Sequence, residues 1–287
     1  MVQNNLSLEE RMHLQDAATA FASYVTEKYP QINEEGQLNY YMSGSLAVML
    51  LSQADSIHLL DSSKLPNVST RETRSLDRGL SAKLADFTRP IGDFDYVETT
   101  AYKDAKKEIP SYSDDPEGYS RERQKFLFKG GGGPSIDELP DLAKDVLAEA
   151  KSGHKVMCDP VSTYGEDQVA QVRIQEIEYF ISDPSQIFGY KVLHLMQSFG
   201  NKPDKFKRDF TILHDALSQL YTEEELIESA YTVLVGFEDS MAKYGPQASK
   251  HMRQLDQNPD FNSTVRPFFE KLKQYDIDHR NIMQING

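Results

Sequence analysis

The chain has 287 residues, of which 39% are hydrophobic and 26% are charged, as is ordinary for a globular protein with a full core. Its formal net charge of −14 argues against a protein that coats nucleic acid with one overall basic surface, although a local basic groove or a carboxylate-rich metal site stays compatible with it. No apolar run approaches the roughly 20 residues that span a bilayer, so we expect no membrane partner.

The first part of the chain is predicted to form a helix, and then a short strand that turns into a second helix. Ser7 and Glu10 fit a helix-capping box, and the apolar residues after them keep helical spacing. The apolar run Tyr40–Met42 predicts a short buried strand. Gly44-Ser45 would turn this strand into a helix that starts at Leu46.

A further helix is predicted at 69–85, inside an insertion that covers about 55–90. Ser69 and Glu72 fit another capping box. Three arginines would then share one helix face: Arg71, Arg74 and Arg78. This face would suit the phosphate backbone of a nucleic-acid acceptor. The alternative is a solvated helix whose arginines pair with neighbouring carboxylates.

The middle of the chain is predicted to alternate strands with one long loop. Residues 89–100 predict a strand, and residues 103–137 predict an irregular loop. The glycines Gly130–Gly133 favour a flexible hinge over a phosphate-binding loop, because no Gly-Lys-Ser/Thr sequence follows them. Three elements are predicted after that loop: a helix at 137–152 and strands at 154–161 and 168–180.

The character of the sequence changes near residue 184. Four segments beyond it carry helical periodicity: 187–199, 205–221, 222–245 and 264–275. We therefore predict two domains, at 1–184 and 185–287. The expected fold class is α+β, with a mixed, twisted β-sheet flanked by helices and a C-terminal helical bundle.

The start of the chain and its cysteine content both favour a cytoplasmic location. The first residues, MVQNNLSLEERMHLQ, lack the basic and then apolar segments of an export signal. The single cysteine, Cys158, cannot form an internal disulfide, and no Cys/His cluster has zinc spacing. We expect Cys158 to act as a small buried hydrophobic residue.

Asp93 and Asp95 are the first candidates for chemistry. On a strand, alternation places both carboxylates on one face and Phe94 on the other. Such carboxylates repel each other unless a cation lies between them, and an oxygen-only site suits Mg²⁺ or Mn²⁺. Two ions held there can clamp the attacking and leaving oxygens of an in-line displacement. The alternative is an exposed strand edge that carries protective charges.

Gly44 and Ser45 are candidates for binding phosphate. They lie where the predicted strand turns into a helix, so free backbone N–H groups and the helix dipole would favour an anion there. Glycine permits close approach of the ligand, and the Ser45 hydroxyl can donate to a phosphate oxygen. The alternative is an ordinary helix start with a turn glycine.

Together, SGSLAVML and IGDFDYV resemble the signature of the DNA polymerase β-type nucleotidyltransferase superfamily. In that family a strand, a Gly-Ser turn and a helix precede a strand with two aspartates, and a neighbouring strand supplies a third carboxylate. The resemblance implies a nucleotidyltransferase core in which Asp159 of HKVMCDPV joins Asp93 and Asp95 as a metal ligand and catalytic residue. Glu176 and Glu178 are the alternatives, and Asp159 would then be a turn residue.

The C-terminal half resembles the abortive-infection nucleotidyltransferase toxins of the AbiEii type, in SDPSQIFGYKVLHLMQS and KFKRDFTILHDAL. Those proteins have a lysine on the helix after the last strand and a basic-Asp motif on the next helix. The resemblance implies that Lys191 contacts the triphosphate of a bound NTP. Three residues match the second motif: Lys207, Arg208 and Asp209. The alternatives are a solvated lysine and a solvated helix face, and His194 is expected to be a packed or surface residue.

The expected activity is therefore transfer of an NMP from an NTP to an acceptor, with release of pyrophosphate. The resemblance suggests RNA, including tRNA, as the acceptor, and a toxin role in a bacterial toxin–antitoxin or phage-defence system with an antitoxin as partner. Two alternatives stay open. The first is transfer to a protein or to a small molecule such as an antibiotic, which the acidic composition favours. The second is a catalytically silent nucleotide-binding or interaction module of the same fold.

Overall fold

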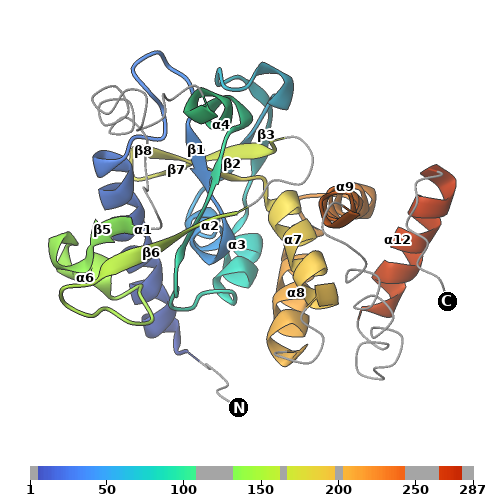
Figure 1. The fold of residues 1–287 in the computed structure, drawn as a ribbon. Coiled ribbons are helices and arrows are strands. Elements are labelled where there is room, and N and C mark those ends of the chain that lie inside the picture. The colour runs from blue at the N-terminus through green and yellow to red at the C-terminus, as the bar shows by residue number, and fades with distance from the viewer. Residues whose placement is uncertain (1–5, 108–131, 162–166, 198–202, 243–264, 280–287) are drawn as a thin grey trace. The chain divides into compact units, whose positions relative to one another are not determined.

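The computed structural model describes residues 6–107, 132–161, 167–197, 203–242 and 265–279 (Figure 1). These residues divide into two compact units. The first unit contains the described residues of 1–77, 88–162 and 167–182, and the second contains those of 78–87 and 183–287. Helix α3 (Arg78–Ala85) therefore groups with the C-terminal helices rather than with the segments that flank it in the sequence.

Eight strands of the first unit form one mixed sheet, in the order β3-β2-β7-β8-β1-β4-β6-β5. Their bounds are β1 (Tyr40–Met42), β2 (Ser56–Leu60), β3 (Thr70–Ser75), β4 (Phe94–Glu98), β5 (Gly132–Ser135), β6 (Lys155–Pro160), β7 (Val169–Ile174) and β8 (Ile177–Ser182). The pairs β8–β1 and β4–β6 are parallel, and the other neighbours are antiparallel. This mixed sheet with flanking helices confirms the α+β class.

The helices of the first unit flank this sheet. They are α1 (Leu8–Lys28), α2 (Gly44–Leu51), α4 (Thr100–Lys107) and α6 (Asp141–Lys144), with single 3₁₀ turns η1 (Ser62–Lys64) and η3 (Ile136–Glu138). The predicted capping box of α1 is confirmed, because the Glu10 N–H donates to Ser7 Oγ and the Ser7 N–H donates to Glu10 Oε2. Phe21 of α1 packs edge-to-face on Phe94, with ring centroids 5.9 Å apart.

Around Asp95 and Asp159, strands β4 and β6 bury the side chains of one face and direct these two acids to the other. Phe94 and Tyr96 of β4 are buried, with their rings stacked at a centroid distance of 5.8 Å. Val156 and Cys158 of β6 are buried as well. Because side chains alternate along a strand, Asp95 and Asp159 project from the opposite face. The apolar face anchors the strands, so the position of the acids is set by the core beneath them.

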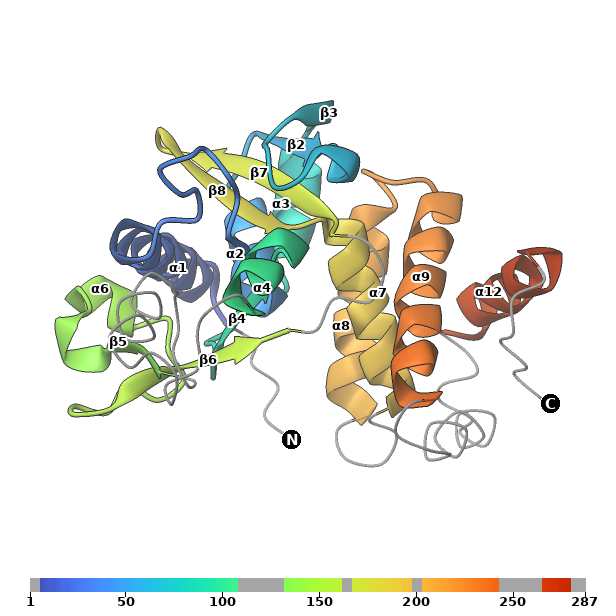
Figure 2. The same ribbon diagram turned by 45° about the horizontal axis from the view of Figure 1, so that its top comes forward.

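The second unit is helical in its described part, with α7 (Pro184–Gln197), α8 (Pro203–Leu217), α9 (Glu223–Ala242) and α12 (Arg266–His279) besides α3. Helix α7 packs on both α8 and α9, and α12 packs on α9 (Figure 2). Glycine is required where α7 meets α9, since a Cβ on Gly189 would lie 3.0 Å from the Ser229 carbonyl oxygen and 2.9 Å from Val233 Cγ2.

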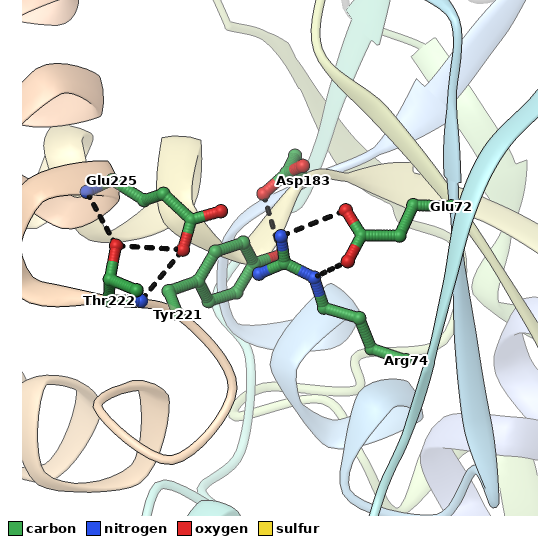
Figure 3. A network of polar contacts seen from close by, with 6 residues as sticks. All are labelled: Glu72, Arg74, Asp183, Tyr221, Thr222 and Glu225. Carbon is green, nitrogen blue, oxygen red and sulfur yellow. Dashed lines mark hydrogen bonds and ion pairs between the residues drawn. The ribbon is translucent and has the colours of Figure 1, made fainter.

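Polar contacts hold the connection from α8 to α9 at the end where α9 begins. The Tyr221 hydroxyl donates to the Asp183 carboxylate at the start of α7, over 2.8 Å. Thr222 and Glu225 form a reciprocal capping box at the start of α9 (Figure 3).

None of the helices in the described part of the chain combines the length and apolar character needed to cross a bilayer.

The predicted helix at 69–85 is wrong. Residues Thr70–Ser75 form strand β3, and only Arg78–Ala85 is helical. Glu72 and Arg74 share one face of that strand, where the carboxylate accepts from Arg74 Nε over 2.9 Å (Figure 3). Arg71 is the extra residue of a β-bulge opposite Leu59 and Leu60, and Arg78 lies on α3, so the predicted helix face of three arginines does not exist. Pairing with β2, whose Ile57 and Leu59 are buried, outweighs the local capping signal.

Three further predictions change. Only Asp141–Lys144 is α-helical within the predicted helix at 137–152. The single strand predicted at 168–180 is the hairpin β7–β8, which turns at Gln175 and Glu176 with φ of 49° and 71°. The predicted loop at 103–137 begins within α4, and its last glycines, Gly132 and Gly133, belong to β5. Gly130 and Gly131 lie outside the described residues.

Candidate functional site

Asp93, Asp95 and Asp159 form one cluster on the first unit. Asp93 directly precedes β4, Asp95 lies within it, and Asp159 is the register partner of Asp95 on the parallel strand β6. One carboxylate oxygen from each residue lies within 4.8 Å of the others. Asp93 and Asp95 are half-buried, and Asp159 is exposed. The two aspartates at β4 are therefore partly shielded from solvent, whereas Asp159 on β6 is open to it.

The acidic triad suits a hard divalent cation. All its donors are carboxylate oxygens, which Mg²⁺ prefers, and three such charges repel one another when no cation is bound. Two oxygens bound trans to one Mg²⁺ are about 4.2 Å apart, so small rotations of the side chains close the triad around an ion. The other candidates for a third carboxylate are engaged on the β7–β8 hairpin: Glu176 pairs with Arg173, and Glu178 accepts from Gln171.

Cys158 contributes no ligand to this cluster. Its side chain is 2% exposed, which confirms the prediction of a buried hydrophobic residue. Burial, together with the negative charge of Asp159, raises the pKa of the Cys158 thiol to about 12. A Cβ on Gly133 would lie 2.4 Å from its sulfur, so β5 closes tightly over it. The thiol stays protonated at neutral pH, and the donor set is oxygen only.

Gly44 lies directly against the Asp95 carboxylate. Its φ is +64°, and a Cβ there would come within 1.9 Å of Asp95 Oδ2. The Ser43 N–H donates to the Asp95 carbonyl oxygen over 2.9 Å, which ties β4 to the start of α2. Helix α2 begins at Gly44, two residues before the predicted Leu46, and the Ser43 side chain does not cap it. The first turn of α2 and the acidic triad are thus in contact through a position that only glycine fits.

Arg89 is a site residue that the sequence did not predict. Its guanidinium donates to Ser45 Oγ from Nε over 3.2 Å and from Nη2 over 3.0 Å. A serine hydroxyl that accepts these bonds still has its own hydrogen to donate, so Ser45 and Arg89 offer donors together at the start of α2. The sequence feature that could have identified Arg89 is its position, four residues before Asp93 and at the start of the segment that carries the two aspartates.

The remaining candidates lie in the second unit. Lys191 Nζ is 3.6 Å from Asp209 Oδ2, and the two side chains are only 11% and 3% exposed. The lysine also lies over the ring of Phe87, 5.6 Å from its centroid. The alternative of a solvated lysine is therefore wrong for Lys191. Lys207 is half-buried and Arg208 is exposed. Triphosphate contacts by these residues stay a prediction.

Replacing Lys191 with alanine is expected to lower the free energy of unfolding by about 3 kcal/mol, because it breaks an ion pair whose two side chains are almost fully buried. The double variant Lys191→Met/Asp209→Leu removes both charges and should restore most of the lost stability. Urea denaturation of the three proteins measures both effects. Equal stability of wild type and Lys191→Ala would show that the ion pair contributes nothing to folding.

His194, one turn after Lys191, makes the stability of the protein depend on pH. Burial, and secondarily the charge of Lys191, lowers the pKa of His194 from 6.5 to about 4. Between pH 6.5 and about 4, the unfolded chain therefore binds a proton at His194 that the folded chain does not. The contribution of neutral His194 to stability is complete above pH 6.5 and is lost as the pH falls to about 4.

We expect the free energy of unfolding to fall by roughly 2 kcal/mol across this range because of His194. This is less than the full pKa shift corresponds to, since the imidazole is partly exposed. Urea denaturation at several pH values, on wild type and His194→Gln, isolates the contribution. Identical pH dependence in the two proteins would remove His194 as its source.

Comparison with family models, with curated proteins and with solved structures gives no match for this chain. The residues that indicate a function are therefore the side chains of the site itself. They comprise three clustered carboxylates, two of which are register partners, a glycine that fits closely against one of them, and an Arg-Ser pair at the adjoining helix start.

Proposed function

We propose that this chain is a metal-dependent nucleotidyltransferase, which transfers an NMP from an NTP to a hydroxyl group of an acceptor. The observation that carries the proposal is the acidic triad, in which Asp95 and Asp159 are register partners and Asp93 completes an oxygen-only donor set. The contact between Gly44 and Asp95 supports it independently, because it places a helix N-terminus beside the metal ligands.

Asp93, Asp95 and Asp159 would hold Mg²⁺ or Mn²⁺. Bound there, the cation neutralises charge on the phosphates and lowers the pKa of the attacking hydroxyl. The acceptor oxygen forms a bond to the α-phosphorus, the bond from that phosphorus to the bridging oxygen of the β-phosphate breaks, and pyrophosphate leaves. Asp159 is the exposed member of the triad, and it receives the hydroxyl proton and passes it to water.

The start of α2 holds the leaving phosphates in this proposal. Backbone N–H groups after Gly44, the Ser45 hydroxyl and the Arg89 guanidinium supply donors of the kind that bind phosphate oxygens. Lys191 and the Lys207-Arg208-Asp209 motif keep the triphosphate role that the family resemblance implies. The same resemblance supports an RNA acceptor, a toxin role in the cytoplasm and an antitoxin as partner.

The direct test incubates the purified chain with each α-labelled NTP, Mg²⁺ and total cell RNA. We expect one or more NTPs to label an acceptor and to release pyrophosphate in equal amount, and we expect chelation of the metal to stop both. Labelling from a γ-labelled NTP would contradict nucleotidyl transfer, because the γ-phosphate leaves with pyrophosphate. No release of pyrophosphate with any NTP or acceptor, RNA or protein, would overturn the proposal.

A further inference from the structure

The face of β6 that carries Asp159 also carries two other exposed side chains. Lys155, Met157 and Asp159 alternate with the buried residues of the strand, so they lie in one line on the same face. Met157 is 61% exposed, although its side chain is large and apolar. We call these three residues the β6 outer face.

Among the residues that the structure describes, the neighbours of Met157 leave it exposed beside the acidic triad. The residue paired with it on β5 is Gly132, and β5 is the last strand of the sheet. On the other side, the register that pairs Asp95 with Asp159 sets Met157 at the level of Asp93. A single exposed apolar residue is ordinary elsewhere on a surface, but this one lies next to two proposed metal ligands.

The β6 outer face offers three kinds of contact in a fixed order. Asp159 offers a carboxylate, Met157 offers a polarisable apolar surface, and Lys155 offers a positive charge. Each step of two residues along a strand is about 6.6 Å. The carboxylate of Glu138, from the neighbouring 3₁₀ turn η3, forms an ion pair with Lys28 and also attracts Lys155 at longer range.

We infer that the β6 outer face binds the 3′-terminal nucleotide of a single-stranded nucleic acid, which is the acceptor. This inference rests on the proposed function. The terminal hydroxyl lies at Asp159, the base packs on Met157, and the phosphate on its 5′ side contacts Lys155. Thioether sulfur packs favourably on aromatic rings, and every base presents such a ring, so this contact recognises a nucleotide without selecting its sequence.

The test measures binding of a fluorescently labelled, single-stranded oligoribonucleotide with a free 3′ hydroxyl, by anisotropy and without NTP. Met157→Ala should raise the dissociation constant about tenfold, because part of the apolar contact is lost. Met157→Leu should bind within about twofold of wild type, since it keeps most of the apolar surface. Met12→Ala is the matched control, because Met12 is 56% exposed on α1 and should leave binding unchanged.

Lys155→Ala should reduce the dependence of log Kd on log salt by about 0.7, the value for one phosphate contact with a single strand. Lys151→Ala is its control, since Lys151 is exposed and paired with Glu149. All these positions are exposed, so each variant should keep the wild-type midpoint of urea denaturation.

Unchanged affinity in both Met157→Ala and Lys155→Ala would overturn the inference. Weaker NTP binding with unchanged oligonucleotide binding in Met157→Ala would also overturn it, because the residue would then contact the donor. Transfer to a protein without oligonucleotide binding would overturn this inference and leave the transferase standing. Oligonucleotide binding that depends on Met157, with no transfer from any NTP, would support the β6 outer face and overturn the transferase.

Discussion

Replacing Asp95 with asparagine is expected to reduce Mg²⁺-dependent NMP transfer about a thousandfold. The amide keeps the shape of the side chain but removes a negative charge from the donor set, and loss of metal assistance raises a reaction barrier by several kcal/mol. The folded protein should not lose stability without metal, since the change relieves repulsion with Asp93 and Asp159. Initial rates of transfer, together with titration of Mn²⁺ binding, measure the effect on the site.

Asp141→Asn is the matched control for this change. Asp141 lies at the start of α6, pairs with Lys144 and is fully exposed, so its replacement should leave both transfer and Mn²⁺ binding at wild-type values. Near-normal turnover in Asp95→Asn with intact Mn²⁺ binding would remove Asp95 from the metal site. Equal losses in the two variants would indicate an effect of net charge rather than of the acidic triad.

The arrangement of the acids follows from patterns that the sequence displays. Asp93 and Asp95 flank Phe94 on a short apolar segment, and alternation alone places them on one face. The strand around Asp159 shows the same alternation, with Val156 and Cys158 directed to the core. The register between β4 and β6 was not predictable from periodicity, because it depends on which strands become neighbours. The family resemblance supplied only the expectation that a neighbouring strand carries the third carboxylate.

The wrong or missing predictions concern residues whose structure depends on contacts with residues distant in the sequence. Residues Thr70–Ser75 carry a helical capping signal, yet they pair with β2 along most of its length. The contact of Arg89 with Ser45 joins residues 44 positions apart, and the ion pair of Lys191 with Asp209 joins two helices. None of these contacts has a local sequence signature. Local patterns therefore predicted the acids, whereas tertiary packing determines that Arg89 contacts Ser45 and that Lys191 pairs with Asp209.

Gly44 is the position at which fold and proposed chemistry are most closely coupled. A side chain there would require a φ of +64° and would place Cβ 1.9 Å from Asp95 Oδ2 and 2.8 Å from Asp95 Cγ. The backbone conformation costs a residue other than glycine about 1–2 kcal/mol, and overpacking of a close contact adds about 1–3 kcal/mol. We therefore expect Gly44→Ala to lower the free energy of unfolding by about 4 kcal/mol and to displace Asp95 from the acidic triad.

Gly36→Ala separates these two causes. Gly36 has a similar φ of +78°, but a Cβ there would meet nothing within 4 Å, so its replacement should lower stability by only about 1–2 kcal/mol. Urea denaturation measures both variants, and Mn²⁺ titration should show weaker binding in Gly44→Ala alone. Adding Asp95→Ala to Gly44→Ala removes the clashing carboxylate, so the double variant should be more stable than Gly44→Ala. Equal losses in Gly36→Ala and Gly44→Ala, with Mn²⁺ binding unchanged, would show that Gly44 serves only the turn and does not position Asp95.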